Sequence, residues 1–259
     1  MPSQFVAQQE ALLRAMGVRG RLGGAPYHGV ARLSWDEELQ RQGALSLSAL
    51  TVIFPGGELI DIPGNAVVNT LPFGETEENW VEVYAHLLAE TVEVTDDDEA
   101  GGGGDDTRIT RVVHQLELST SPGRSGARKS LKLARFDRHV DGTWRLGVYV
   151  PPLLQIGTSP FLRDILRADQ ELLQRLDIDF ARQMRDPFLG GEHVERLQRG
   201  SAAAYRLRSL LVDISGQIRP HPYDLFCALR DFYAEVCLLE KHAVAEPIPY
   251  DHEDIRGCF

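Results

Sequence analysis

The stretch EHVERLQRGSAAAYRLRSLLVDISGQI, residues 192–218, carries the clearest structural signal in the sequence. Its apolar and small residues recur at alternating steps of three and four, which fills both core positions of a heptad repeat. A helix with a coiled-coil-like seam is therefore expected over 192–218. The seam positions of this helix are Leu197, Ala204, Leu207, Leu211, Ile214 and Ile218, with Gly200 in the same register.

Two further helices are expected on either side of this one. Before it, apolar residues between 161 and 185 follow a helical stripe, with Thr158 or Ser159 as the cap. After it, the segment RPHP, residues 219–222, breaks the helix, and Pro222 suits the first turn of the next one. Two heptad helices joined by a tight turn form an antiparallel hairpin. The seam positions of the third helix are Leu225, Leu229, Phe232 and Val236.

Apolar side chains outside the seams enlarge the apolar surface of these helices. We expect copies of the chain to bury this surface against one another, and packing against the β domain of the same chain is the alternative. An aspartate in place of Leu211 would put a charge into the seam and is expected to lower the oligomeric state. The residues outside the seams are Tyr205, Leu210, Phe226, Tyr233 and Cys237.

The sequence before the helices has the alternation of β-strands. Val81, Val83 and Ala85, for example, share one face of an extended segment. Turn-forming residues at 55–57 and 141–143 each separate two strand-like runs, which indicates two hairpins. The expected fold class is therefore α+β, with an N-terminal β-rich sandwich-like domain followed by an antiparallel helical bundle. The expected domains are 1–158 and 159–259.

Two polar segments interrupt the strand pattern. The segment TDDDEAGGGGDDT, residues 95–107, has no apolar group to bury and is expected to be a mobile loop. A phosphate-binding glycine loop is disfavoured there, because the flanking aspartates would repel a phosphate. Residues 119–130 form a second expected loop, which is basic through Arg124, Arg128 and Lys129.

Composition excludes several classes of protein. The formal net charge is −11, whereas binding to nucleic acid or to an anionic membrane surface requires a basic patch. No apolar run is long enough to insert into a membrane, and the first residues do not resemble a signal peptide. Three cysteines without a Cys-x-x-Cys spacing fit a reducing cytosol, so a cytoplasmic protein without nucleic-acid partners is expected.

The common catalytic motifs are missing from the sequence. It contains no His-Glu-x-x-His, no Gly-x-Ser-x-Gly and no phosphate-binding Gly-x-x-x-x-Gly-Lys segment. The cluster YDHED, residues 250–254, could contribute to a metal-assisted hydrolase through His252 and its neighbouring carboxylates. A hydrated connector, with Asp251 or Asp254 capping a following turn, is the favoured interpretation. No catalytic residue, cofactor or metal is therefore expected.

Several segments, in order, resemble the TssK family of type VI secretion baseplate subunits, and together they span nearly the whole chain. The chain differs from the family pattern at Ser3 and Gln4, and it ends at residue 259, where the family continues into a head domain. The expectation is a truncated or shortened member with shoulder and neck only. The residues that carry the resemblance are Pro2, Phe5 and Gln8, then GALSLSAL (43–50), FPGGE (54–58), VYVPPLLQIGTSPFL (148–162), RPHPYDLF (219–226) and IPYDHEDI (248–255).

The resemblance implies a non-catalytic, homotrimeric adaptor in the cytoplasm. In that family a β-rich shoulder docks on the wedge proteins TssF and TssG, and a head domain reaches the membrane-complex proteins TssL and TssM. Contact with TssL and TssM is therefore expected only if a head domain is present. The shoulder and neck also resemble phage-tail receptor-binding proteins, so a phage-tail-like, glycan-binding module is the main alternative.

Overall fold

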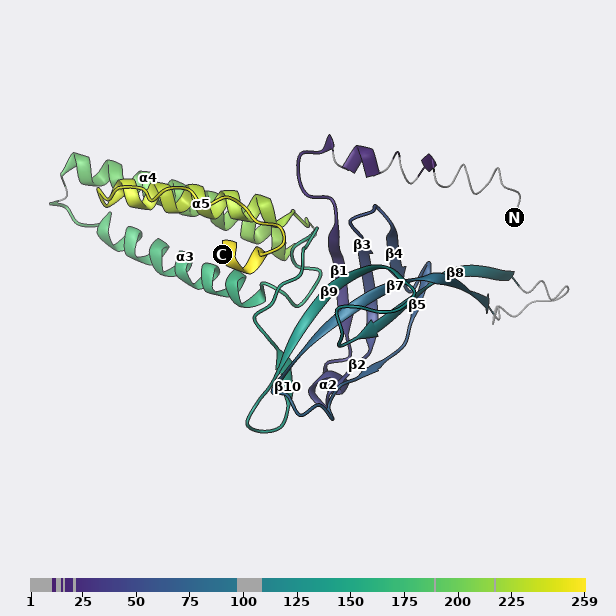
Figure 1. The fold of residues 1–259 in the computed structure, drawn as a ribbon. Helices are drawn as coiled ribbons and strands as arrows, with labels where there is room; N and C mark the ends of the chain where they lie inside the picture. Colours follow the sequence, from purple (N-terminus) through teal and green to yellow (C-terminus); the bar gives the residue numbers. More distant parts are fainter. Residues whose placement is uncertain are drawn as a thin grey trace, which may run out of the picture. The chain divides into compact units, whose positions relative to one another are not determined.

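Strands make up the first part of the chain and helices the second, which confirms the α+β class (Figure 1). This computed structural model describes residues 22–96, 109–188, 190–216 and 218–259, together with 11, 12, 15 and 17–20. The chain divides into two units, Met1–Pro151 and Pro152–Phe259. The division falls between two prolines, ahead of the expected boundary at residue 158. In the described part of the chain, no helix is both long and apolar enough to cross a membrane.

A three-stranded antiparallel sheet opens the first unit. Its order is β1 (Gly29–Trp35), β3 (Leu47–Ile53) and β4 (Leu59–Ile62). The expected hairpin at 55–57 is confirmed, because Ile53 lies opposite Leu59 across that turn. Gly57 has a φ of 94° there, a left-handed conformation that favours glycine.

A five-stranded sheet forms the rest of the β-structure. Its order is β10 (Trp144–Leu146), β9 (Ala127–Arg138), β7 (Trp80–Asp96), β8 (Ile109–Ser119) and β5 (Ala66–Val68), and only β5 runs parallel to its neighbour. The expected hairpin at 141–143 is confirmed by the pairing of β9 with β10, although β10 ends at Leu146 rather than continuing to Val150.

The expected loop segments flank strand β8. The register of β7 and β8 extends to Asp96 opposite Ile109. The expected mobile loop at 95–107 therefore begins inside β7, and residues 97–107 lie outside the described residues. In the basic segment, β9 already begins at Ala127, so the loop is shorter than the expected 119–130.

A small two-stranded sheet pairs β2 (Ala44–Leu45) with β6 (Leu71–Pro72). Between β1 and β2 lies the short helix α2 (Glu37–Arg41), which Asp36 caps by accepting hydrogen bonds from the amides of Glu38 and Leu39. Gly43 and Gly74 allow the two backbones to approach closely beside this small sheet, since a Cβ on Gly43 would lie 2.3 Å from the Cα of Gly74.

The three sheets meet in a cluster of aromatic rings. Phe136 of β9 lies edge-on to Trp35 of β1, with ring centroids 5.6 Å apart, and stacks on Phe73 at 5.4 Å. Phe73 also lies edge-on to Trp144 of β10. Such rings bury a large apolar area each, and their pairing adds about 0.5–1.5 kcal/mol beyond that. Val81, Val83 and Ala85, which were expected to share one face of a strand, are all buried in β7.

A buried histidine marks the end of strand β8. The Nε2 atom of His86 lies 2.8 Å from the hydroxyl oxygen of Ser119 and 3.2 Å from the carbonyl oxygen of Ser121. Its Nδ1 atom lies 2.7 Å from the hydroxyl oxygen of Ser130. A carbonyl oxygen only accepts hydrogen bonds, so Nε2 carries a hydrogen. Burial lowers the pKa of His86 and so favours the neutral ring, in which Nδ1 accepts from the hydroxyl of Ser130. These contacts hold the chain where it leaves β8.

The second unit contains three long helices, the first of which starts later than expected. Helix α3 spans Arg163–Gln183, and neither Thr158 nor Ser159 caps it. Its N-cap is Leu162 in a left-handed conformation, with φ of 61°. The correction has a packing reason, because Phe161 and Leu162 are buried and their positions fix the entry into the helix.

Helices α4 and α5 meet at a turn that polar groups stabilise. Helix α4 spans Gly191–Ser215 and α5 spans Pro222–Leu239, with Pro222 in the first turn as expected. His221 and Asp224 form a reciprocal capping box at the start of α5. The end of α4 differs from the expectation, because the guanidinium of Arg219 binds the carbonyl oxygens of Ile214 and Gly216 and closes the helix. Ile218 therefore lies beyond the helix and is exposed.

Gly200 allows the three helices to come together. A Cβ at this position would lie 2.9 Å from the ring of Phe180 on α3 and 3.2 Å from Leu239 on α5. The two neighbouring helices therefore meet over one glycine of α4. Two other small residues of α4, Ala203 and Ala204, are also buried. Small side chains permit close helix approach, so the volume at position 200 limits the packing.

Substitution of Gly200 by leucine is expected to destabilise the protein by about 1–3 kcal/mol, because the added atoms overfill a closely packed site. Leucine at the exposed Ala202 of the same helix is the matched control. Urea unfolding followed by circular dichroism measures both. Equal midpoints for Gly200→Leu and Ala202→Leu would contradict close packing at Gly200.

Burial lowers the pKa of His86, so we expect an acid-sensitive contribution to stability. The unfolded histidine takes up a proton at a higher pH than the folded one, so this contribution is complete above about pH 6.5 and declines as the pH falls below it. Urea midpoints measured at about pH 7.5 and about pH 5.5 test this. The drop should be smaller in His86→Gln and unchanged in His139→Gln, whose histidine is exposed. Equal drops in both variants would exclude His86 as the cause.

Candidate interaction surfaces

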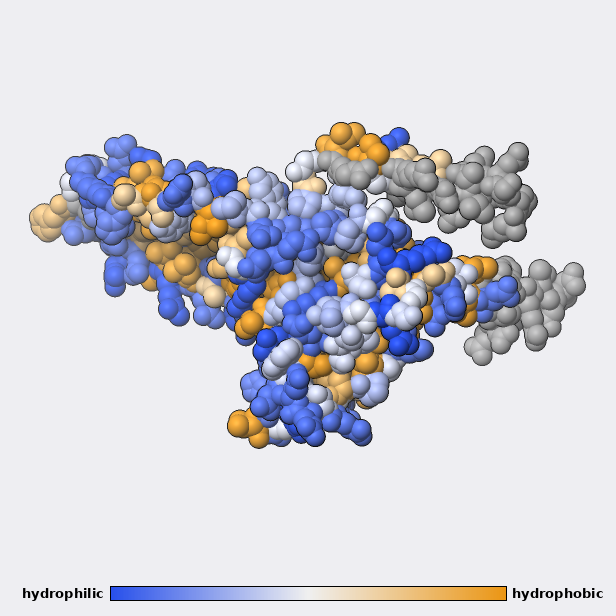
Figure 2. Space-filling view, in the orientation of Figure 1, coloured by the Kyte–Doolittle hydropathy of each residue, from blue (hydrophilic) through white to orange (hydrophobic). Residues whose placement is uncertain are grey.

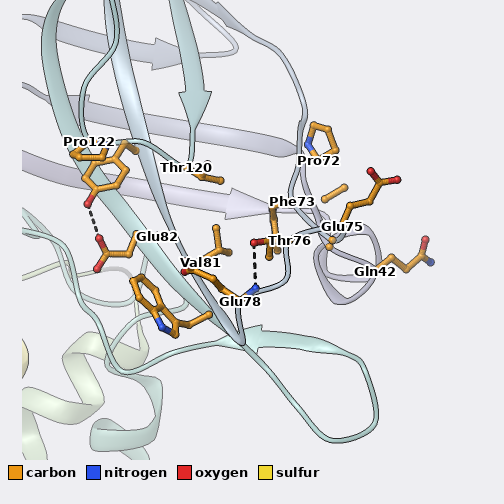
Figure 3. Close-up of a pocket in the computed structure, with 15 residues that line it drawn as sticks. Gln42, Pro72, Phe73, Glu75, Thr76, Glu78, Val81, Glu82, Thr120 and Pro122 are labelled. Carbon is orange, nitrogen blue, oxygen red and sulfur yellow. Dashed lines mark hydrogen bonds between the residues drawn. The ribbon is translucent and has the colours of Figure 1, made fainter.

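The β unit has an open groove of about 990 Å³ beside the start of strand β7 (Figure 3). One wall comes from the small sheet and the chain after it, represented by Pro72 and Phe73. The other wall comes from the chain beyond β8, represented by Thr120 and Pro122. The groove therefore lies between two segments that the aromatic cluster and His86 hold in place.

Carboxylates and aromatic rings line this groove. Lys132 donates to Glu82 at 2.5 Å and the hydroxyl of Tyr84 donates to the same carboxylate at 2.5 Å. These two hydrogen bonds hold the pKa of Glu82 below its usual value, while burial and the bond to Glu82 raise the pKa of Tyr84 to about 12. Trp80 is 42% exposed, with the guanidinium of Arg135 4.9 Å from its ring centroid.

Two further carboxylates, those of Glu75 and Glu78, lie in the groove without a cationic partner among the described residues. The backbone amide of Glu78 donates a hydrogen bond to the hydroxyl oxygen of Thr76 (Figure 3). Because Glu82 is already paired with Lys132, the unbalanced negative charge of the groove belongs to Glu75 and Glu78.

The seam positions of α4 face the interior of the helical unit. All five of those that lie within the helix are at most 6% exposed, whereas Ile218 is 59% exposed. On α5, Leu225 is buried, and Leu229, Phe232 and Val236 are half-buried. The α4 positions are Leu197, Ala204, Leu207, Leu211 and Ile214.

Some of the apolar side chains outside the seams are buried or half-buried within the helical unit, and others are exposed. Phe226 is buried, and Leu210 and Cys237 are half-buried. Tyr205 and Tyr233 remain 62% and 51% exposed. Figure 2 shows apolar patches between the charged side chains of the helical unit. The further exposed apolar residues of the three helices are Leu172, Ile178, Val212, Tyr223 and Leu238.

The YDHED segment packs against the start of α5. The ring of His252 stacks on that of His221, with centroids 5.4 Å apart, and lies within 3.2 Å of the Tyr250 hydroxyl. Asp254 caps a short 3-10 helix, Ile255–Cys258, as expected for a connector. His252 is buried rather than hydrated, which corrects the expectation of a solvated segment. Within the described residues, no group of three His, Cys, Asp or Glu side chains could hold a metal ion.

Sequence reasoning missed the groove and the histidine beside it. His86 was one histidine among eight, without a motif around it. Its serine partners lie at positions 119 and 130, so only the strand register brings them together. The one local signal was Pro122 after a serine-rich segment, which indicates that a strand ends nearby.

Solved structures of the type VI secretion system share this fold. A chain of the TssK–TssF–TssG baseplate subcomplex, solved by cryo-electron microscopy, matches 100% of this chain and 93% of its own length, with a TM-score of 0.75 and 20% identity. The crystal structure of TssK gives the same TM-score and identity over 100% of this chain and 64% of that chain. A chain of the type VI secretion baseplate complex matches with a TM-score of 0.73 and 21% identity, over 100% and 92%. No curated protein sequence matches this chain.

A family model independently covers almost the entire sequence. It is described as bacterial type VI secretion, with EvfL, ImpJ and VasE among its members, and it matches residues 4–96 and 88–259. The structural matches establish the fold, and this match establishes the family. The resemblance to TssK found in the sequence is thereby confirmed, and the chain belongs to the bacterial type VI secretion family of EvfL, ImpJ and VasE.

Proposed function

We propose that this chain is a non-catalytic structural subunit of the type VI secretion baseplate. It self-associates through its helical unit, as a homotrimer, and docks on wedge proteins of the TssF and TssG type through its β unit. The observation that carries the proposal is the uncovered apolar surface of the helices, in a chain of the type VI secretion family. Contact with TssL and TssM is part of the proposal only if a head domain is present.

The inner seam and the outer surface have different roles in this proposal. The seam residues of α4 are already buried within one chain, so they stabilise the bundle. Self-association needs residues that one chain leaves uncovered. Tyr205 and Val212 are seven residues apart on α4, and each is 62% exposed. Residues at this spacing lie on nearly the same side of a helix, so the two form one apolar stripe.

Burial of this stripe between copies is favourable. Removing apolar surface from water contributes roughly 25 cal/mol per Å², and a large side chain contributes about 1.5–3 kcal/mol when fully buried. Exposed apolar residues on α3 and α5, among them Ile178 and Tyr233, extend the available area. A homo-oligomer with closed symmetry covers the same surface on every copy.

The β unit is the proposed docking part. Its groove combines aromatic rings, which are enriched at protein interfaces, with carboxylates that have no cationic partner among the described residues and so attract a basic partner. The alternative of a phage-tail-like receptor-binding module would use the same unit to bind a glycan. The proposed location of the chain is the cytoplasm, as the resemblance to TssK implies.

Aspartates at Tyr205 and Val212 are expected to lower the solution mass measured by light scattering. The wild type should have about three times 28.9 kDa, and the double variant should approach a single copy. Both positions are exposed, so the fold should tolerate the charges, unlike at Leu211, which is buried inside the unit. Arg206→Asp, about 100° further around the same helix, is the control and should keep the wild-type mass. An unchanged mass in the double variant would exclude this stripe as the interface.

Co-purification with the TssF and TssG proteins of the same bacterium tests the docking function. The chain is expected to elute together with them in size-exclusion chromatography, and to bind no glycan on an array. Glycan binding without co-elution would favour the receptor-binding alternative and contradict the proposal.

A further inference from the structure

Strand β7 has an unpaired edge inside the groove. On one side β7 pairs with β9 from Trp80 onward, whereas on the other side its pairing with β8 begins only at Tyr84. No other strand in the described part of the chain pairs with β7. Residues 80–83 therefore have a neighbouring strand on one side alone, and the open side faces the groove.

The hydrogen-bond pattern identifies which backbone groups face the open side. The carbonyl of Asn79 accepts from the amide of Arg138, so residue 79 points its polar groups toward β9. On the next strand, the carbonyl of Arg135 accepts from Gly147, on the side away from β7. Because backbone groups alternate along a strand, the amides and carbonyls of Trp80 and Glu82 point away from β9.

Strand β8 stops short of this edge for an identifiable reason. Ser119 ends the strand, its hydroxyl accepts from the amide of Ser121, and His86 binds both residues. Pro122 follows and has no amide hydrogen to donate to a ladder. A place for a strand is thus left beside residues 80–83, at the position that β8 would occupy if it continued.

The side chains around this place specify its occupant. Glu75 and Glu78 supply negative charge without a cationic partner among the described residues, and Trp80 supplies an exposed aromatic ring. Lysine and arginine side chains pair with carboxylates, and arginine also stacks on aromatic rings. An edge strand is a known template for an added extended segment, whose backbone supplies affinity and whose alternate side chains supply specificity.

We propose that the groove binds an extended, basic segment of a partner protein, which adds as a strand to the open edge of β7 at residues 80–83. This inference rests on the proposed docking function of the β unit and identifies the surface and the chemistry of the docked segment. The added strand hydrogen-bonds to Trp80 and Glu82, and its basic side chains lie beside Glu75 and Glu78.

A fluorescent peptide of alternating arginine and valine serves as the probe, with its binding measured by anisotropy. The same peptide with glutamate in place of arginine is expected to bind at least about tenfold more weakly. N-methylation of alternate amides should weaken binding about tenfold without changing charge, because it removes backbone hydrogen bonds. Equal binding of the methylated peptide would exclude strand addition, and absence of binding by the arginine peptide would overturn the proposal.

Two variants of the chain complete the test. Trp80→Pro removes an open-edge amide that β9 does not use, and Trp80→Val removes the ring but keeps the amide. The affinity for the arginine peptide should fall about tenfold more in Trp80→Pro than in Trp80→Val. The double variant Glu75→Gln, Glu78→Gln should bind the arginine peptide more weakly, whereas its binding of the glutamate peptide should not be weakened. Equal affinities of Trp80→Pro and Trp80→Val would overturn the proposal. Thermal unfolding checks that each variant is folded.

The same variants separate this inference from the proposed function. If the wild type binds the peptide but no wedge protein, the proposed docking on wedge proteins is contradicted, while the proposed binding of a strand in the groove is supported. If Trp80→Pro loses the peptide but keeps the wedge proteins, the groove is not their docking surface and the proposal is wrong. If Trp80→Pro lowers the solution mass, the occupant is a second copy of this chain, which also overturns it.

Discussion

The contact of Phe136 with Trp35 and Phe73 joins the separate sheets of the β unit. Each sheet alone would leave one apolar face in water, and the aromatic cluster is where the three faces meet. Phe73 directly follows the two-residue strand β6, which would be too short to hold its own position. The wall of the groove at Pro72 and Phe73 therefore depends on ring packing in the core rather than on the strand pairing of the small two-stranded sheet.

Polar contacts determine where the regular elements stop. The buried ring of His86 ends β8, and the guanidinium of Arg219 ends α4. In both places a side chain satisfies backbone groups that a longer strand or helix would have paired. The first stop leaves an open strand edge in the groove. The second turns the chain tightly into α5, whose capping box joins Asp224 to His221.

Much of the local structure could be predicted from the sequence. Heptad spacing located α4 and α5, and turn residues located both hairpins, because these features depend on neighbours within a few positions. The start of α3 was misplaced because the burial of Phe161 and Leu162 overrides the capping preference of Thr158 and Ser159. The groove could not be predicted, since it depends on the register that places Ser119 opposite Tyr84, far away in the chain. The roles of the seam residues in self-association stay a prediction.

The parallel pairing of β5 with β8 has a consequence for the rate of folding. Strands β8 and β9 follow β7 along the chain, and both pair antiparallel with β7, one on each side. Strand β5, at Ala66–Val68, must instead find residues 114–116, across the whole length of β7. Contacts between distant residues form late because the chain entropy of the intervening loop opposes them. The pairing of β5 therefore slows the folding of the β unit, and it joins the hairpin of β3 and β4, directly before β5 in the chain, to the edge of the five-stranded sheet.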